Sequence, residues 1–219
     1  MTLPFTALQF LRPAWLLALL LVPAAALAPA AASAQSLVEG QDYVRIADAR
    51  PWQPLDGQVE VAEIFSYACS VCHEFRPMLD AWARRQPDDV RVSHVPAAYR
   101  PGDSFATAFF AAEAIGEHDA VHAATFDAVH RRGMLARNAN VAELAGFYAS
   151  LGVDRQQLAE AMQRPETAAQ VQAAGEFLRR SGAQGTPTLV INGKYRVQGR
   201  TLGDVLRIAE QLIALERAP

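Results

Sequence analysis

The chain has 219 residues, of which 51% are hydrophobic, and its formal net charge at pH 7 is −3. At this size a single domain can bury a substantial core. The nearly balanced charge and the lack of a long basic run argue against a protein that binds the phosphate backbone of nucleic acid.

The first 34 residues have the layout of a secretory signal peptide. One charge, Arg12, precedes the apolar run 14–22, and an alanine-rich stretch then ends at Ala34. The apolar run falls short of the roughly 20 residues that a membrane span needs, although an uncleaved anchor is the alternative. We expect cleavage after Ala34 and an exported mature protein, which meets an oxidising compartment where disulfides persist.

The first predicted elements form a β-α-β unit. After a polar segment, residues 58–66 are rich in β-branched and aromatic side chains, which predicts a strand. From Cys69 to about Arg85 apolar residues recur at helical spacing, so the strand-to-helix turn falls at Cys69. Residues 90–95 predict a second strand, parallel to the first.

Residues 100–164 are almost wholly helical in pattern, and no strand signal interrupts them. Three signatures mark helix starts in this block: Ser104 before 105–115, Asn140 with Glu143, and Asp154 with Gln157. Beyond the block the expected elements are a helix from Pro165 to Arg180 closed by Gly182, a strand over 186–192, a turn at Asn192-Gly193, a strand over 195–197, and a helix from Thr201 to about Leu215.

Both cysteines of the chain lie in the motif Cys69-Ser70-Val71-Cys72. A disulfide between them closes too small a loop to stabilise a domain, so the pair is better interpreted as reactive. The start of a helix stabilises negative charge, and the thiolate is the reactive form of cysteine. We therefore expect Cys69 to be the nucleophile and Cys72 the resolving thiol, with Ser70 and Val71 bordering the bound substrate.

Two other interpretations of the motif are open. A zinc site needs two more ligands, and the chain has no second cysteine pair, so we expect no metal. With His73 the motif also matches the attachment signature of c-type haem, which would make the protein an electron carrier. Such a cytochrome needs a distal ligand, for which Met134 or Met162 could serve.

Three features favour a redox dithiol over haem attachment. The Thr186-Pro187 bond is a candidate for the cis isomer, and a proline at a strand edge exposes the backbone of Thr186 to an extended substrate. Pro77 lies inside the helix that follows the cysteines, where it should kink the axis. Glu63 lies in an apolar strand, and a carboxyl buried there has a raised pKa suited to accepting the Cys72 proton.

On these residues the sequence resembles the DsbA-like periplasmic thiol:disulfide oxidoreductases. The resemblance is carried by residues 63–72, the helical block, and residues 185–195. It implies an α/β protein with a thioredoxin fold and an inserted helical domain, a cis-Pro187 facing the dithiol, and Glu63 as a buried acid. The expected parts are 35–100 and 165–219 for the thioredoxin fold and 101–164 for the insertion.

The resemblance also implies a function. In that family the oxidised form donates its disulfide to reduced, unfolded exported proteins, and a quinone-linked membrane partner reoxidises it. We expect no metal, nucleotide or organic cofactor. The alternative within the enzyme class is an isomerase or reductase, but the short segment before residue 58 leaves no room for a sizeable dimerisation module. An oxidase that is a monomer is therefore favoured.

The chain departs from the family at the residues between the cysteines. The strongest oxidants of the family resemble Cys-Pro-His-Cys, whereas this chain has Ser70 and Val71 and lacks the central histidine. Because a stabilised reduced form makes such a protein oxidising, we predict a weaker oxidant than the family's extreme. His73 lies four residues after Cys69 and is expected to compensate in part.

Overall fold

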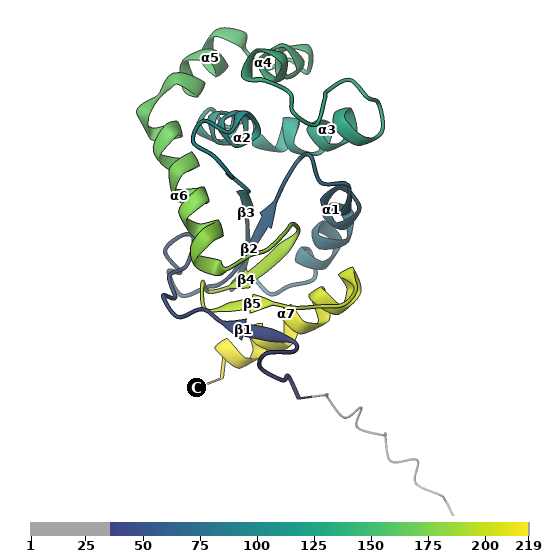
Figure 1. The fold of residues 1–219 in the computed structure, drawn as a ribbon, viewed down its shortest axis with the longest axis vertical. Helices are drawn as coiled ribbons and strands as arrows, with labels where there is room; N and C mark the ends of the chain where they lie inside the picture. The colour runs from purple at the N-terminus through teal and green to yellow at the C-terminus, as the bar shows by residue number, and fades with distance from the viewer. Residues whose placement is uncertain (1–35, 219) are drawn as a thin grey trace, which may run out of the picture. The chain divides into compact units, whose positions relative to one another are not determined.

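A five-stranded sheet with the strand order β1-β5-β4-β2-β3 organises the fold (Figure 1). The computed structural model describes residues 36–218, so the expected signal peptide lies outside the described residues. β2 (Val59–Phe65) and β3 (Val90–Pro96) are parallel and are joined through α1 (Ser70–Ala83), as predicted. β4 (Thr188–Ile191) lies antiparallel on the other side of β2.

The sequence analysis missed one strand. β1 (Tyr43–Arg45) pairs with β5 (Tyr195–Val197) in antiparallel fashion and forms the edge of the sheet. Three residues are too few to display the alternation by which a strand is recognised. The sequence analysis therefore described this part of the chain only as a polar segment. Tyr43 is nevertheless buried and packs edge-on against Tyr195, with ring centroids 5.4 Å apart.

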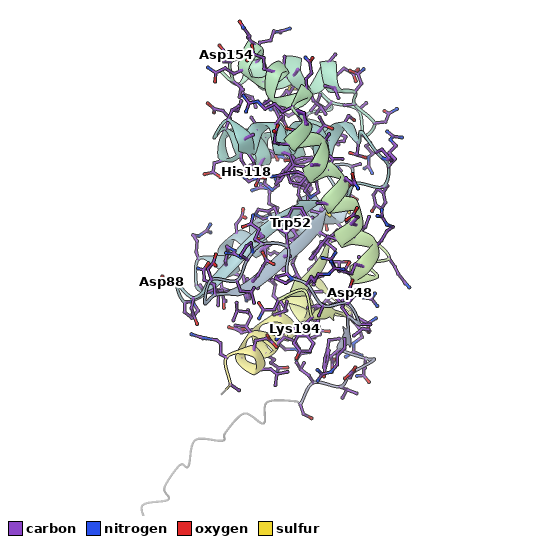
Figure 2. All side chains as sticks on the ribbon, turned by 90° about the vertical axis from the view of Figure 1, so that its left-hand side faces the viewer. Asp48, Trp52, Asp88, His118, Asp154 and Lys194 are labelled. Carbon is purple, nitrogen blue, oxygen red and sulfur yellow. The ribbon has the colours of Figure 1, made fainter. Side chains whose placement is uncertain are left out.

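Four helices follow β3, and we refer to them together as the helical insertion. They are α2 (Ser104–Ala114), α3 (His118–His130), α4 (Val141–Ser150) and α5 (Arg155–Gln163). α6 (Pro165–Ser181) returns the chain to the sheet, and α7 (Leu202–Glu216) ends the described fold. Figure 1 shows the insertion gathered at one end of the sheet, and Figure 2 labels Asp154 at its far end and His118 on the side near the sheet.

The helix starts that the sequence predicted are confirmed except at α2, and the start of α3 had no predicted signal. Ser104 does not cap that helix, because the side chain of Asp103 accepts the Ala106 N–H at 3.2 Å and Ser104 instead donates to the carbonyl of Ala139. The predicted capping box of Asn140 and Glu143 is confirmed in both directions. The remaining predicted boundaries also hold: Asp154 and Thr201 cap α5 and α7, Pro165 begins α6, and Gly182 ends it at φ +65°.

Two hydrophobic cores lie on opposite faces of the sheet. One packs α1 and α7 against the strands. The other joins the sheet to α6 and the insertion, and Phe65 lies at its centre. The fully buried ring of Phe65 has its centroid 5.0 to 5.8 Å from those of Tyr67, Phe109, His122 and Phe126. Over residues 36–218, every helix is too short or too polar to cross a membrane.

Candidate active site

The two cysteines lie where β2 passes into α1. Cys69 is the N-cap of α1, and its Sγ accepts a hydrogen bond from the Cys72 backbone N–H at 3.3 Å. Cys69 is partly exposed, whereas Cys72, one turn further, has no exposed surface. Both are free thiols in the structure. The predicted placement of Cys69 at the first turn of a helix is confirmed.

The surroundings give the two thiols opposite acidities. Burial disfavours the Cys69 thiolate, but hydrogen bonds that favour it, among them those from the backbone N–H groups of Cys72 and Val71, outweigh burial and lower the pKa of Cys69. Burial raises the pKa of Cys72 far above its ordinary value. The arrangement therefore presents one accessible thiol that ionises readily beside one that stays protonated.

The loop before β4 closes over the dithiol. The Thr186-Pro187 peptide bond is cis, as expected from the sequence. The carbonyl of Thr186 lies 3.2 Å from the Sγ of Cys69 and accepts its proton in a hydrogen bond, although the two residues are 117 positions apart. A hollow of about 270 Å³ adjoins this loop and is lined by residues 184–188 and 196–198.

Glu63 is buried, as predicted, but it has a partner that sequence reasoning missed. Its carboxylate accepts a hydrogen bond from Nδ1 of His94 at 2.8 Å, and the β2–β3 register places the two residues opposite each other. Burial disfavours the charged form of His94, yet the hydrogen bond and charge of Glu63 raise its pKa. The predicted pairing of the two parallel strands was the signal that could have indicated this partner, because side chains at paired positions of neighbouring strands lie side by side.

Comparison with known proteins identifies the family. A family model described as Thioredoxin matches residues 55–210. The thiol:disulfide interchange protein DsbA of Azotobacter vinelandii is 34% identical over 184 residues, which cover 82% of this chain and 84% of that protein. The chain belongs to the DsbA family of thiol:disulfide oxidoreductases. Membership decides for a redox dithiol at Cys69 and Cys72 and against the c-type cytochrome hypothesis.

Other members of the DsbA family agree with this assignment. The DsbA of Pseudomonas syringae pv. tomato is 30% identical over 202 residues, covering 90% of this chain and 93% of that protein. The crystal structure of oxidoreductase DsbA from Xylella fastidiosa superposes with a TM-score of 0.80 at 42% identity. The match covers 84% of this chain and 99% of the Xylella chain, so the two proteins share the thioredoxin fold with inserted helices over nearly their whole length.

His73 lies one turn after Cys69 in this DsbA-family protein, as its spacing predicts, and its ring contacts α3. Its Nε2 donates to the Asp127 carboxylate at 3.1 Å, and its ring stacks on that of His130 at a centroid distance of 5.2 Å and an angle of 14°. Helical spacing does place His73 one turn after Cys69, but the acceptor and the aromatic face on α3 draw its ring toward the insertion. His73 therefore joins α1 to α3, and its expected compensation for the missing central histidine stays a prediction.

A second histidine group lies in the core of this DsbA-family protein. His122 is buried, its Nδ1 lies 2.8 Å from the Tyr67 hydroxyl, and its ring lies 5.0 Å from His94 and 4.8 Å from His118. Burial, reinforced by the charges of His94 and His118, lowers the pKa of His122 well below its ordinary value. Within residues 36–218, no three acidic, histidine or cysteine side chains are arranged to hold a metal ion.

The buried His122 predicts that stability depends on pH. Below about pH 6.5 the unfolded chain binds a proton at this residue and the folded protein does not, so the free energy of unfolding falls as the pH falls. We expect His122→Gln to remove up to about 1.4 kcal/mol per pH unit of that dependence between about pH 6.5 and pH 5, measured by urea denaturation.

His94→Gln is the matched variant, because the contribution of His94 to the pH dependence of stability has the opposite sign. Because its folded pKa is raised, His94 contributes stability that is present in acid and lost as the pH rises through that pKa. Its loss should remove a decrease in the free energy of unfolding above about pH 6.5 and leave the slope between pH 6.5 and pH 5 unchanged. An unchanged slope in His122→Gln would show that His122 is protonated equally in the folded and unfolded states.

Proposed function

We propose that this protein is a periplasmic disulfide donor, which oxidises reduced exported proteins and is itself reoxidised by a quinone-linked membrane partner. The observation that carries the proposal is the contrast between the two thiols. A lowered pKa at Cys69 stabilises the reduced protein, and a stabilised dithiol makes the corresponding disulfide a better oxidant. The predicted signal peptide and the names of the relatives support the location.

Transfer begins with the Cys69–Cys72 disulfide of the oxidised protein. A substrate thiolate attacks Sγ of Cys69, which forms a mixed disulfide and breaks the bond to Cys72. The thiolate released at Cys72 is buried, so it takes up a proton, which we assign to the hydrogen-bonded pair of Glu63 and His94. The substrate thiol that became the attacking thiolate released one proton, and that proton replaces the one that the pair gives up.

A second substrate thiolate completes the reaction. It attacks the substrate sulfur of the mixed disulfide and releases the Cys69 thiolate, which the hydrogen bonds at the start of α1 stabilise. The substrate dithiol has then lost two electrons to form its disulfide, and the protein dithiol has gained them. The step uses no metal or organic cofactor.

The loop before β4 and the residues between the cysteines are the proposed substrate surface. Thr186 and cis-Pro187 border the partly exposed Cys69, so an extended chain can pair with the backbone at this edge. Val71 is 43% exposed and offers an apolar contact, with Ser70 beside it. Recognition through the backbone suits an enzyme whose substrates differ in sequence.

The reduction potential of the purified mature protein tests the proposal, after its visible spectrum has been recorded. Equilibration with glutathione should give a potential near or above about −150 mV, as expected of a disulfide donor whose reduced form is stabilised. A value near about −250 mV would instead assign the protein to a reductase or isomerase role. A Soret band in the spectrum would contradict the dithiol mechanism altogether.

A further inference from the structure

Two side chains of the helical insertion bind the turn that carries Cys69. Nε2 of His130, the last residue of α3, donates to the carbonyl of Tyr67 at 2.8 Å. Nη1 of Arg137, in the connection between α3 and α4, donates to the carbonyl of Ala68 at 3.1 Å. The Ala68 carbonyl belongs to the peptide group whose N–H is that of Cys69. The guanidinium therefore lies one peptide group away from the reactive residue.

Among the charged side chains around this turn within residues 36–218, Arg137 is the one that a hydrogen bond to the turn holds in place. The titratable groups near the turn are Cys72 on α1, then Tyr99, Arg100 and Asp103 in the connection between β3 and α2, and His130 and Arg137 from the insertion. The Asp103 carboxylate caps α2. Burial lowers the pKa of His130, as does the charge of Arg137, so both disfavour a positive charge on His130. His73 is turned toward Asp127. The guanidinium of Arg137 thus brings a positive charge to the turn.

We propose that Arg137 is a positioning residue whose charge stabilises the Cys69 thiolate and so makes the protein a stronger oxidant. The inference rests on the proposed function and extends it to a residue outside the thioredoxin-like part of the chain. A positive charge close to a partly buried thiolate favours the ionised form of the thiol. Their attraction is strong there because protein atoms screen it less than water does. The hydrogen bond to Ala68 holds the guanidinium in place.

The proposal also accounts for the residues between the cysteines. Ser70 and Val71 provide no charge, and the nearest histidine in sequence, His73, is engaged with Asp127. Arg137, which reaches the turn from the insertion, supplies the positive charge that the residues between the cysteines lack. The insertion then tunes the chemistry of the dithiol as well as bordering it.

The first test compares Arg137→Gln with Arg137→Lys. Glutamine can retain a hydrogen bond to Ala68 without charge, whereas lysine retains the charge. We expect Arg137→Gln to weaken the equilibrium constant for oxidation of glutathione by roughly three- to tenfold and to raise the pKa of Cys69, read from the pH dependence of thiolate ultraviolet absorbance. Arg137→Lys should stay within about twofold of the parent.

The matched control is Arg155→Gln, which removes the same charge from the same insertion. Arg155 begins α5, next to Asp154 at the far end of the insertion in Figure 2. Its equilibrium constant should stay within about twofold of the parent, because salt and water screen a charge at the far end of the insertion from the dithiol. Raising the salt concentration should narrow the difference between Arg137→Gln and the parent.

Several results would overturn the proposal. One is an Arg137→Gln protein, folded by urea denaturation, whose Cys69 pKa and equilibrium constant match those of the parent. Another is an equal shift in Arg137→Lys and Arg137→Gln that salt does not alter, which would assign the effect to the hydrogen bond rather than the charge. If the parent protein failed to oxidise a reduced peptide, the proposed function would fall, while the thiolate titration would still decide the role of Arg137.

Discussion

Cys72→Ser is expected to stop catalytic turnover and to trap substrates on Cys69. The variant keeps the accessible thiol of low pKa, so its thiolate can attack a peptide disulfide and displace one peptide thiol. Without a resolving thiol the mixed disulfide persists, and we expect the rate of its breakdown to fall on the order of a thousandfold. Mass spectrometry after a single turnover should find one peptide attached to Cys69.

Cys69→Ser is the matched control. It retains Cys72, which has no exposed surface and a strongly raised pKa, so we expect no adduct and no disulfide transfer. Both variants should unfold at urea concentrations close to that of the reduced parent. An adduct on Cys72 at a rate comparable with that on Cys69 would reverse the roles that we assign to the two thiols.

Phe65→Ala is expected to destabilise the fold by about 3 to 5 kcal/mol. Phe65 ends β2, has no exposed surface, and packs against rings from the Cys69 turn and from α2 and α3. Removing it leaves a cavity where the sheet meets the insertion. Urea denaturation of the reduced protein measures the loss directly.

Met134→Ala provides the comparison for Phe65→Ala. Met134 is 56% exposed in the connection between α3 and α4, so its truncation should change the free energy of unfolding by no more than about 0.5 kcal/mol. A loss below about 1 kcal/mol in Phe65→Ala would mean that the surrounding rings close over the cavity, and that the aromatic cluster is less rigidly packed than its buried contacts indicate.

Local patterns predicted the parts of the site that are contiguous in sequence. The apolar spacing after Cys69 placed the cysteine at a helix start, and the apolar neighbours of Glu63 indicated its burial. Asp103 and Ser104 are adjacent residues that both cap helices well, so the sequence alone could not choose between them. The three-residue β1 was too short to be recognised as a strand from the sequence.

Contacts across the chain could not be predicted in this way. His94 becomes the partner of Glu63 only once the register of the two parallel strands is fixed. His130 and Arg137 reach the Cys69 turn across 63 and 69 residues, and nothing in their local sequence points to it. His73 was placed on the correct helix, but Asp127 determines where its ring points.

The span of chain between Cys69 and Thr186 bears on when this protein becomes reactive. The hydrogen bond between them joins segments 117 residues apart, and β2 receives β4 only after the whole insertion has been made. Such long-range pairing forms late in folding, because the entropy of closing the loop opposes it until then. Until β4 docks, Cys69 lacks its contact with Thr186 and belongs to an incompletely folded chain. Before it folds, this thiol:disulfide oxidoreductase therefore resembles the reduced, unfolded proteins that we propose as its substrates.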